Sequence, residues 1–113
     1  MKLAFVMDPI SQISYKKDST LAMMVEAQEK GHEIFYIEPN CLFFNSEKPC
    51  AKFSPISVKY EESNWFEKGE NNISSLDLFD AILMRQDPPF DMGYINNTYI
   101  LEAATKLGVK VFN

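Results

Sequence analysis

The stretch that decides the fold reads Leu-Met-Arg-Gln-Asp-Pro-Pro-Phe-Asp at residues 83–91, directly after the apolar residues Ala81 and Ile82. A short apolar run of this kind is typical of a buried strand in a parallel sheet. The two prolines fix the backbone and remove two donors, and each pushes the residue before it toward extended geometry. The chain therefore cannot continue directly into a helix, and we expect a rigid turn that holds one arginine and two aspartates.

A second apolar run ends in the same way. Residues 2–7 are followed by Asp8 and Pro9. We therefore expect two rigid polar turns side by side at one edge of a parallel sheet. That edge is where open α/β sheets bind their ligands.

The rest of the chain alternates between strand and helix patterns. Glycines at 31 and 108 stand where the two longer helical patterns stop, as expected for helix C-termini. We expect strands at 2–7, 33–38, 81–84 and 109–112, longer helices from Asp18 (with Asp18 or Ser19 as the N-cap) to Gly31 and from about 92 to 107, and a short helix at 75–79.

The middle of the chain, approximately residues 41–78, has a different pattern. Candidate strands at 42–44 and 51–53 flank a polar turn and suggest a hairpin, and 56–60 alternates as a half-buried strand would. Trp65 and Phe66 are expected to continue an antiparallel edge. The whole order predicts one α/β domain over residues 1–113, with a mainly parallel open sheet of at least four strands and an antiparallel insertion at about 41–78.

Composition excludes several classes of function. A formal net charge of −5 disfavours sequence-independent nucleic-acid binding, and the lack of an apolar run of about 18 residues argues against a membrane protein. No secretory leader is evident, so we expect a cytoplasmic protein with free thiols at Cys41 and Cys50. The four glycines form no phosphate-binding loop, and one histidine without a CxxC pair disfavours zinc.

Candidate binding residues fall at the two strand ends and at the start of the first helix. Arg85 can bind a carboxylate through two parallel hydrogen bonds, and Asp87 can orient the guanidinium or accept from an ammonium group. Lys17 and Asp18 stand where a helix N-terminus favours an anion. A purely structural interpretation stays open beside this one: Arg85 could pair with Asp87 or Asp91. For Asp18 a helix cap, and for the lysine a solvated side chain, are the preferred interpretations, although a cap and a ligand contact are compatible.

Four segments together resemble a known family. Residues 6–10, 16–19, 82–91 and 98–102 resemble, in order and spacing, the N-terminal domain of bacterial glutathione synthetase, and Met-Arg-x-Asp-Pro-Pro-Phe-Asp is the most specific string. The resemblance covers essentially the whole chain and implies a Rossmann-like pre-ATP-grasp domain. The family joins γ-glutamylcysteine to glycine with ATP and magnesium through an acyl phosphate, and its nucleotide and metal sites belong to the domains that follow.

The resemblance also implies what this chain does and does not contribute. The chain stops about where the family enters the rest of the enzyme, so we expect it to be inactive alone, with no catalytic, cofactor or metal residue of its own. The implied partners are γ-glutamylcysteine or glutathione, the ATP-grasp domain of the same enzyme, and further copies in a homo-oligomer. The implied substrate contacts are Arg85 as a clamp, Asp18 as an acceptor for the substrate amine or a cap, Asp8, Ile10 and Ser11 as loop neighbours, and Lys17 and Asp87 as further contacts.

Two alternatives stay open on the sequence. One is a free-standing binding or assembly module, which would expose the aromatic side chains of the middle segment, Phe43, Phe44, Phe53, Trp65 and Phe66. The other is a domain of a different ATP-grasp ligase that joins another carboxylate to an amine. Solvent accessibility separates the first alternative from the enzyme interpretation, in which these aromatics are core or interface residues.

Overall fold

Four parallel strands form the centre of the fold. In the computed structural model, which describes residues 1–12, 19–61, 63–86 and 90–112, they lie side by side in the order β2-β1-β7-β8. β1, β2 and β7 are short, largely apolar runs that end where polar turns begin, and β8 is a three-residue strand. Their bounds are Lys2–Met7 for β1, Glu33–Ile37 for β2, Ala81–Arg85 for β7 and Lys110–Phe112 for β8.

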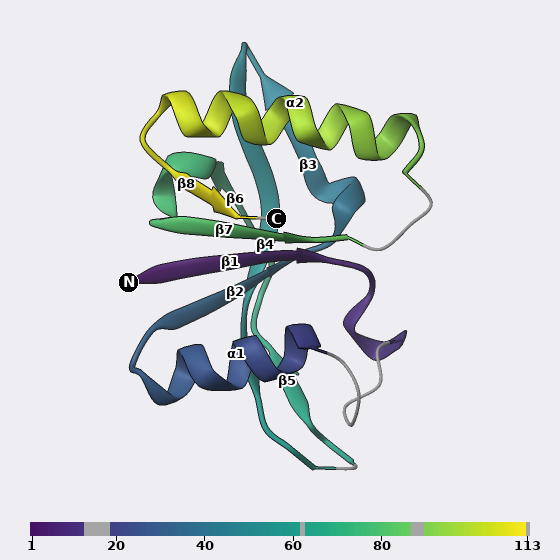
Figure 1. Cartoon of the computed structure of the whole chain (residues 1–113), viewed down its shortest axis with the longest axis vertical. Coiled ribbons are helices and arrows are strands. Elements are labelled where there is room, and N and C mark those ends of the chain that lie inside the picture. The colour runs from purple at the N-terminus through teal and green to yellow at the C-terminus, as the bar shows by residue number, and fades with distance from the viewer. Residues whose placement is uncertain (13–18, 62, 87–89, 113) are drawn as a thin grey trace.

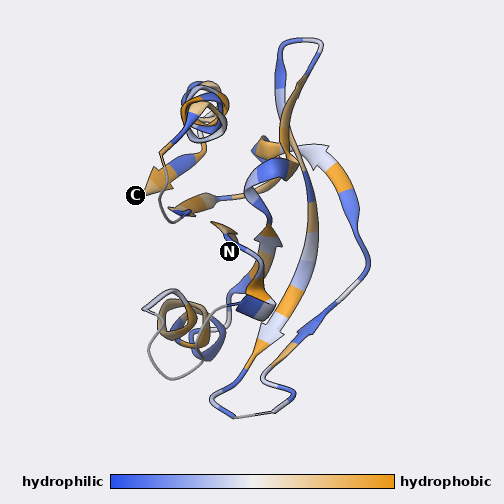
Figure 2. Cartoon of the chain, turned by 90° about the vertical axis from the view of Figure 1, so that its right-hand side faces the viewer, coloured by the Kyte–Doolittle hydropathy of each residue, from blue (hydrophilic) through white to orange (hydrophobic). Residues whose placement is uncertain are grey.

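One helix packs on each face of these strands. Helix α1 (Ser19–Glu29) connects β1 to β2, and α2 (Met92–Lys106) connects β7 to β8. Figures 1 and 2 show the two helices on opposite sides of the strands. Gly31 and Gly108 follow the helices with φ of +85° and +96°, a conformation that ends a helix and that glycine adopts without strain. Neither helix is long and apolar enough to cross a membrane.

The antiparallel strands form around one long strand, β4 (Lys48–Val58). The predicted hairpin is confirmed, because β3 (Leu42–Asn45) pairs with β4. β4 also pairs with β2, β5 and β6, all antiparallel, so the predicted α/β fold with its mainly parallel sheet and antiparallel segment is confirmed. The bounds of the shorter strands are Phe66–Lys68 for β5 and Asn72–Ser75 for β6.

Two details of the middle segment differ from the prediction. The strands expected at 51–53 and 56–60 are one continuous strand, β4, which runs through Pro55. Proline fits there because β4 changes partners at this point, from β6 through Phe53 to β5 from Ile56 onward. The short helix expected at 75–79 is a 3₁₀ turn, Leu76–Leu78. β6 had no clear sequence signal.

The aromatic residues of the middle segment are mostly covered. Phe53 is buried, and Phe43, Trp65 and Phe66 are half-buried. Phe44 alone of this group is exposed. This burial favours the core interpretation of these side chains over an exposed assembly surface. Cys41 and Cys50 carry free thiols, as predicted.

Candidate functional site

The two polar turns begin side by side. β1 and β7 pair in parallel, with Met7 opposite Arg85. Asp8 and Gln86 therefore follow at the same carboxyl edge of the sheet, as the sequence predicts. This edge is the usual ligand-binding edge of an open α/β sheet.

Arg85 joins the end of β7 to the start of α1. Its Nε donates to Thr20 Oγ1 at 3.1 Å, and its Nη2 donates to Ser19 Oγ at 2.6 Å. These hydroxyls come from a segment more than sixty positions earlier in the chain. The guanidinium is therefore held between the sheet edge and the first turn of the helix.

This arrangement is chemically suited to an anionic group. A guanidinium carries five N–H donors in a fixed fork that matches a carboxylate, and the two described bonds use only two of these donors. The N-terminal end of a helix adds a partial positive charge close to Ser19. A carboxylate placed here would meet both the cation and the helix dipole.

The structure decides one of the structural alternatives for Arg85. No ion pair joins Asp91 to Arg85, both of which are described, and the Asp91 carboxylate accepts from the backbone N–H of Tyr94 at 3.1 Å and caps α2. Among the described residues, ion pairs join Lys30 to Glu26 and Lys59 to Glu61. The alternative pairing with Asp87 falls outside the described residues.

The remaining predicted site residues lie in two groups. Asp8 is half-buried directly after β1, and Ile10 and Ser11 belong to the 3₁₀ turn Ile10–Gln12, where Ile10 is buried and Ser11 is exposed. The structure therefore brings Asp8, Ile10, Ser11 and Arg85 to one edge. Three predicted residues, Lys17, Asp18 and Asp87, lie outside the described residues.

Tyr36 supports the first turn from β2. The backbone N–H of Ile10 donates to Tyr36 Oη at 3.0 Å, and this hydroxyl donates to Glu38 Oε1 at 3.1 Å. Burial raises the pKa of the Tyr36 phenol well above its usual range, and the Glu38 carboxylate raises it further, although the bond from Ile10 lowers it. The hydroxyl therefore stays protonated and keeps both hydrogen bonds at neutral pH.

Asn97 supports the second turn from α2. Its side-chain amide is buried, with 6% of the residue exposed, and Nδ2 donates to the Pro39 carbonyl at 2.9 Å and to Gln86 Oε1 at 3.1 Å. One side chain thus ties the residue after Arg85 to the turn that follows β2. The carboxyl ends of three parallel strands are held together by Tyr36, Asn97 and Arg85.

A comparison with known protein families matches this chain from end to end. The matching family model is described as "Prokaryotic glutathione synthetase, N-terminal domain" and covers residues 1–113. The chain belongs to this family. The resemblance noted in the sequence is therefore confirmed, and the described chain corresponds to the N-terminal domain of a glutathione synthetase.

Curated glutathione synthetases from several bacteria are similar to the whole chain. The protein from Pseudomonas putida is 48% identical over 113 residues, that from Vibrio parahaemolyticus 46% and that from Coxiella burnetii 41%. Each comparison includes all of this chain but only 36%, 36% and 35% of the respective relative. The chain thus spans about a third of the length of these glutathione synthetases.

Sequence reasoning about this glutathione synthetase domain did not predict the supporting roles of Tyr36 and Asn97. It also did not predict that Ser19 and Thr20 accept hydrogen bonds from Arg85. The sequence could have indicated a role for Tyr36, because a tyrosine in the middle of a buried strand needs a hydrogen-bond partner for its hydroxyl. Nothing in the sequence indicated a role for Asn97, since a polar residue in a helical pattern is normally solvated. Its burial depends on how α2 sits over the ends of β2 and β7.

We expect Asn97→Asp to destabilise the glutathione synthetase domain by about 1–3 kcal/mol, because the carboxylate loses the donor and faces two oxygen acceptors in a buried site. Part of the loss should be recovered at low pH, where a protonated aspartate can donate again. Urea unfolding followed by circular dichroism at pH 7 and pH 5 measures both effects. Asn96→Asp, on the exposed side of the same helix, is the matched control. Equal stability of the two variants would contradict the bridging role.

Proposed function

We propose that this chain, as a single domain, forms one wall of the peptide-substrate site of a cytoplasmic glutathione synthetase that joins γ-glutamylcysteine to glycine with ATP and magnesium. The observation that supports this most directly is the position of Arg85. Its guanidinium is fixed by Ser19 and Thr20 at the carboxyl edge of the sheet, where a carboxylate or peptide group can dock.

The role proposed for these residues is positioning. Arg85 binds a carboxylate or peptide oxygen of γ-glutamylcysteine, and Asp18 accepts from the substrate ammonium or caps α1. The neighbours Asp8, Ile10 and Ser11 line the same edge, and Lys17 and Asp87 add further contacts. Holding two reactants in a reactive geometry can contribute several kcal/mol to rate enhancement, roughly 7–11 kcal/mol in the best intramolecular cases.

We propose that ATP and magnesium bind to parts of the enzyme outside this domain. Within the described ranges, no three His, Cys, Asp or Glu side chains gather as ligands for a metal ion. We therefore propose no ATP or magnesium contact for the described residues. Those contacts would come from the polypeptide that lies beyond the matched third of the relatives. γ-Glutamylcysteine or glutathione would bind between this domain and that polypeptide. Assembly into a homo-oligomer is part of the same proposal.

A fusion protein tests the proposed activity. Residues 1–113 are joined to the part of the Pseudomonas putida glutathione synthetase that lies beyond its matched 36%, giving what we call the full-length fusion. We expect it to consume ATP only when both γ-glutamylcysteine and glycine are present, and we expect residues 1–113 alone to consume none. The Pseudomonas putida part alone is the control for activity that does not need this domain.

Two outcomes would contradict the proposed function. One is a full-length fusion that consumes ATP equally well with unrelated carboxylates in place of γ-glutamylcysteine, which would indicate a different ligase. The other is tight ATP binding by residues 1–113 alone in calorimetry, which would place the nucleotide site in this domain.

A further inference from the structure

On one face of the parallel sheet, the side chains become more exposed to solvent toward β8. The strand register places Tyr36, Phe5, Leu83 and Phe112 in one row across β2, β1, β7 and β8. Residues in one row share a face of the sheet. Tyr36 and Phe5 at one end of this row are buried, with 3% and 1% of the residue exposed. Leu83 is half-buried, and Phe112 at the other end is 54% exposed.

The loss of cover is confined to the α1 face. Tyr36 and Phe5 pack into the cluster that contains the α1 residues Leu21 and Met24. On the opposite face, the neighbouring row runs through Ala4 and Ile82, both 0% exposed, to half-buried Val111, and these residues pack with α2. α2 therefore covers its face as far as β8. The α1 cluster on the other face reaches β7 only at half-buried Leu83 and does not include Phe112.

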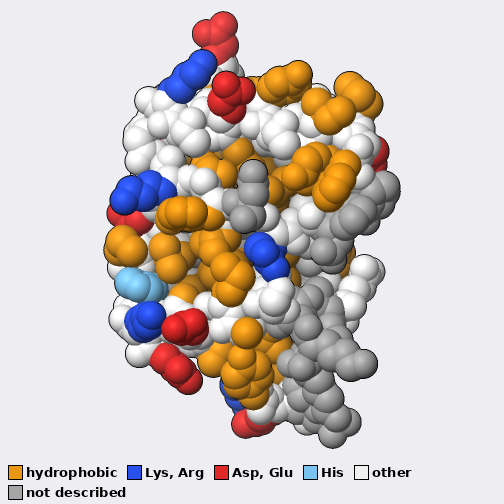
Figure 3. All heavy atoms as spheres, viewed as in Figure 1, with side chains coloured by type: hydrophobic (Ala, Val, Ile, Leu, Met, Phe, Trp, Pro, Cys, Tyr) orange, Lys and Arg blue, Asp and Glu red, His pale blue; other side chains and the backbone are white. Residues whose placement is uncertain are grey.

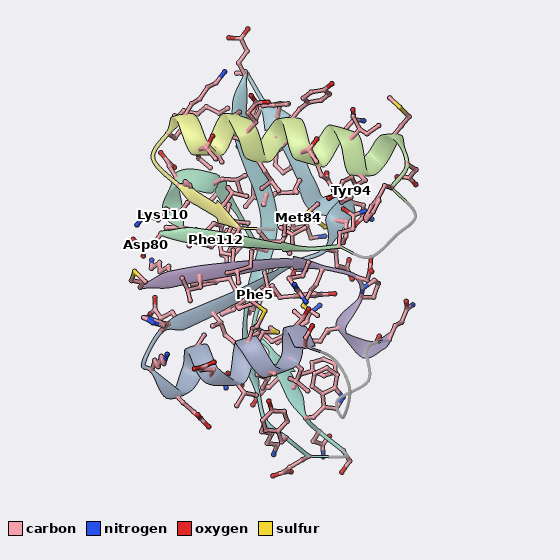
Figure 4. The ribbon with its side chains drawn as sticks, in the orientation of Figure 1. Phe5, Asp80, Met84, Tyr94, Lys110 and Phe112 are labelled. Carbon is pink, nitrogen blue, oxygen red and sulfur yellow. The ribbon has the colours of Figure 1, made fainter. Side chains whose placement is uncertain are left out.

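An open hollow lies where the cover ends. Its volume is about 640 Å³, and it is lined by residues of β1, β7 and β8 and of the turns beside them, among them Leu3, Leu83 and Phe112. None of the described residues that line it comes from α1. Figure 3 shows hydrophobic side chains gathered over these strands between the two helices. In Figure 4, Phe112 lies over β7, with Asp80 and Lys110 toward the end where β1 and β7 begin.

A parallel sheet is normally buried on both faces by helices, because its strands are apolar on both sides. An apolar area this open on a soluble fold usually marks an interaction surface. Edge pairing by another strand fits less well, because β8 has only three residues and offers a short template. The relatives carry nearly twice as much further polypeptide as the matched part, since the chain covers 36% of their length.

We propose that an α-helix with an apolar face, from the polypeptide outside the matched domain in full-length glutathione synthetases, packs on this face against Leu83 and Phe112. Asp80 and Lys110 at the rim favour a helix whose end at that side carries polar side chains of both signs. The helix would lie beside Arg85, which projects from the same face of β7 two residues after Leu83. This proposal rests on family membership and on the uncovered face, and does not depend on the proposed substrate.

Hydroxyl-radical labelling with mass spectrometry tests the proposal directly. Phe112 labelling in the full-length fusion should be lower than in residues 1–113 alone by about tenfold, in proportion to the exposed apolar area that is lost. Tyr60, which is 58% exposed two residues after the end of β4, should be labelled equally in both proteins. Low labelling of Phe5 and Tyr36 in both proteins reports that the domain is folded. Equal labelling of Phe112 in the two proteins would overturn the proposal.

A pair of matched substitutions gives a second test in the full-length fusion. Phe112→Asp should lower its Tm and restore labelling at Leu83, whereas Tyr60→Asp should do neither. Two results would refute the proposed occupant: equal effects of the two substitutions, or sedimentation showing that residues 1–113 alone form a dimer in which Phe112 is already protected. The second result would assign the face to another copy of the chain. Neither result bears on whether γ-glutamylcysteine is the substrate.

Discussion

Arg85→Ala in the full-length fusion should lower kcat/KM for γ-glutamylcysteine by about 10- to 150-fold, the equivalent of the roughly 1.5–3 kcal/mol that a hydrogen bond to a charged group contributes. The substitution removes the guanidinium from the carboxyl edge of the sheet and also leaves the Ser19 and Thr20 hydroxyls without this partner. Steady-state kinetics with γ-glutamylcysteine varied at saturating ATP and glycine measure the effect. The KM for ATP should stay nearly unchanged.

Two further variants distinguish the loss of a specific guanidinium contact from a general loss of positive charge. Arg85→Lys keeps the charge but loses the bidentate fork, so it should recover only part of the lost activity. Lys30→Ala removes a cation at the other end of α1, where Lys30 pairs with Glu26 on the surface, and should leave the kinetics unaltered. If Arg85→Ala unfolds at the same urea concentration as the unmodified fusion and shows the same kinetics, Arg85 does not contact the substrate.

Phe79→Ala should cost about 3–5 kcal/mol of folding stability, the range for removing a buried phenylalanine from a core. Phe79 is buried between Phe35 and Phe53, with ring centroids 5.4 Å and 5.1 Å away. These three rings join the parallel sheet to β4, because Phe35 belongs to β2 and Phe53 to β4. Since domains of this size are stable by only about 5–15 kcal/mol, the variant should be close to unfolding at room temperature.

Urea unfolding of residues 1–113, followed by far-ultraviolet circular dichroism, measures this loss. Phe44→Ala is the matched control, because Phe44 is an exposed phenylalanine on β3 and its truncation removes little buried area. We expect the control to change stability by less than about 0.5 kcal/mol, as for most surface substitutions. A similar midpoint for both variants would mean that the three-ring cluster does not hold β4 on the sheet.

The sequence was sufficient for the parallel part of the fold because each element there has a local signal. The apolar runs before Asp8 and before Asp87 mark buried strands, and Gly31 and Gly108 mark where helices end. The resemblance to glutathione synthetase rested on the same turns and is confirmed over the whole chain. The middle segment was harder, because β4 is one long strand that changes partners along its length, where two shorter strands were expected.

The sequence also predicted Arg85 at the carboxyl edge of the sheet, but it could not name what holds the guanidinium. Ser19 and Thr20 are its partners because β1 and β7 pair with Met7 opposite Arg85, which carries the arginine to the start of α1. Asn97 reaches Pro39 and Gln86 for a similar reason, through the seating of α2 over two strand ends.

By itself, then, the amino-acid order determined where strands, turns and helices occur, since apolar periodicity, proline and glycine act on neighbouring residues. Only the tertiary structure decided which side chains meet at the carboxyl edge and which face near β8 is left uncovered. Those contacts depend on strand order and register, and a register is fixed by packing between segments that lie far apart in the chain.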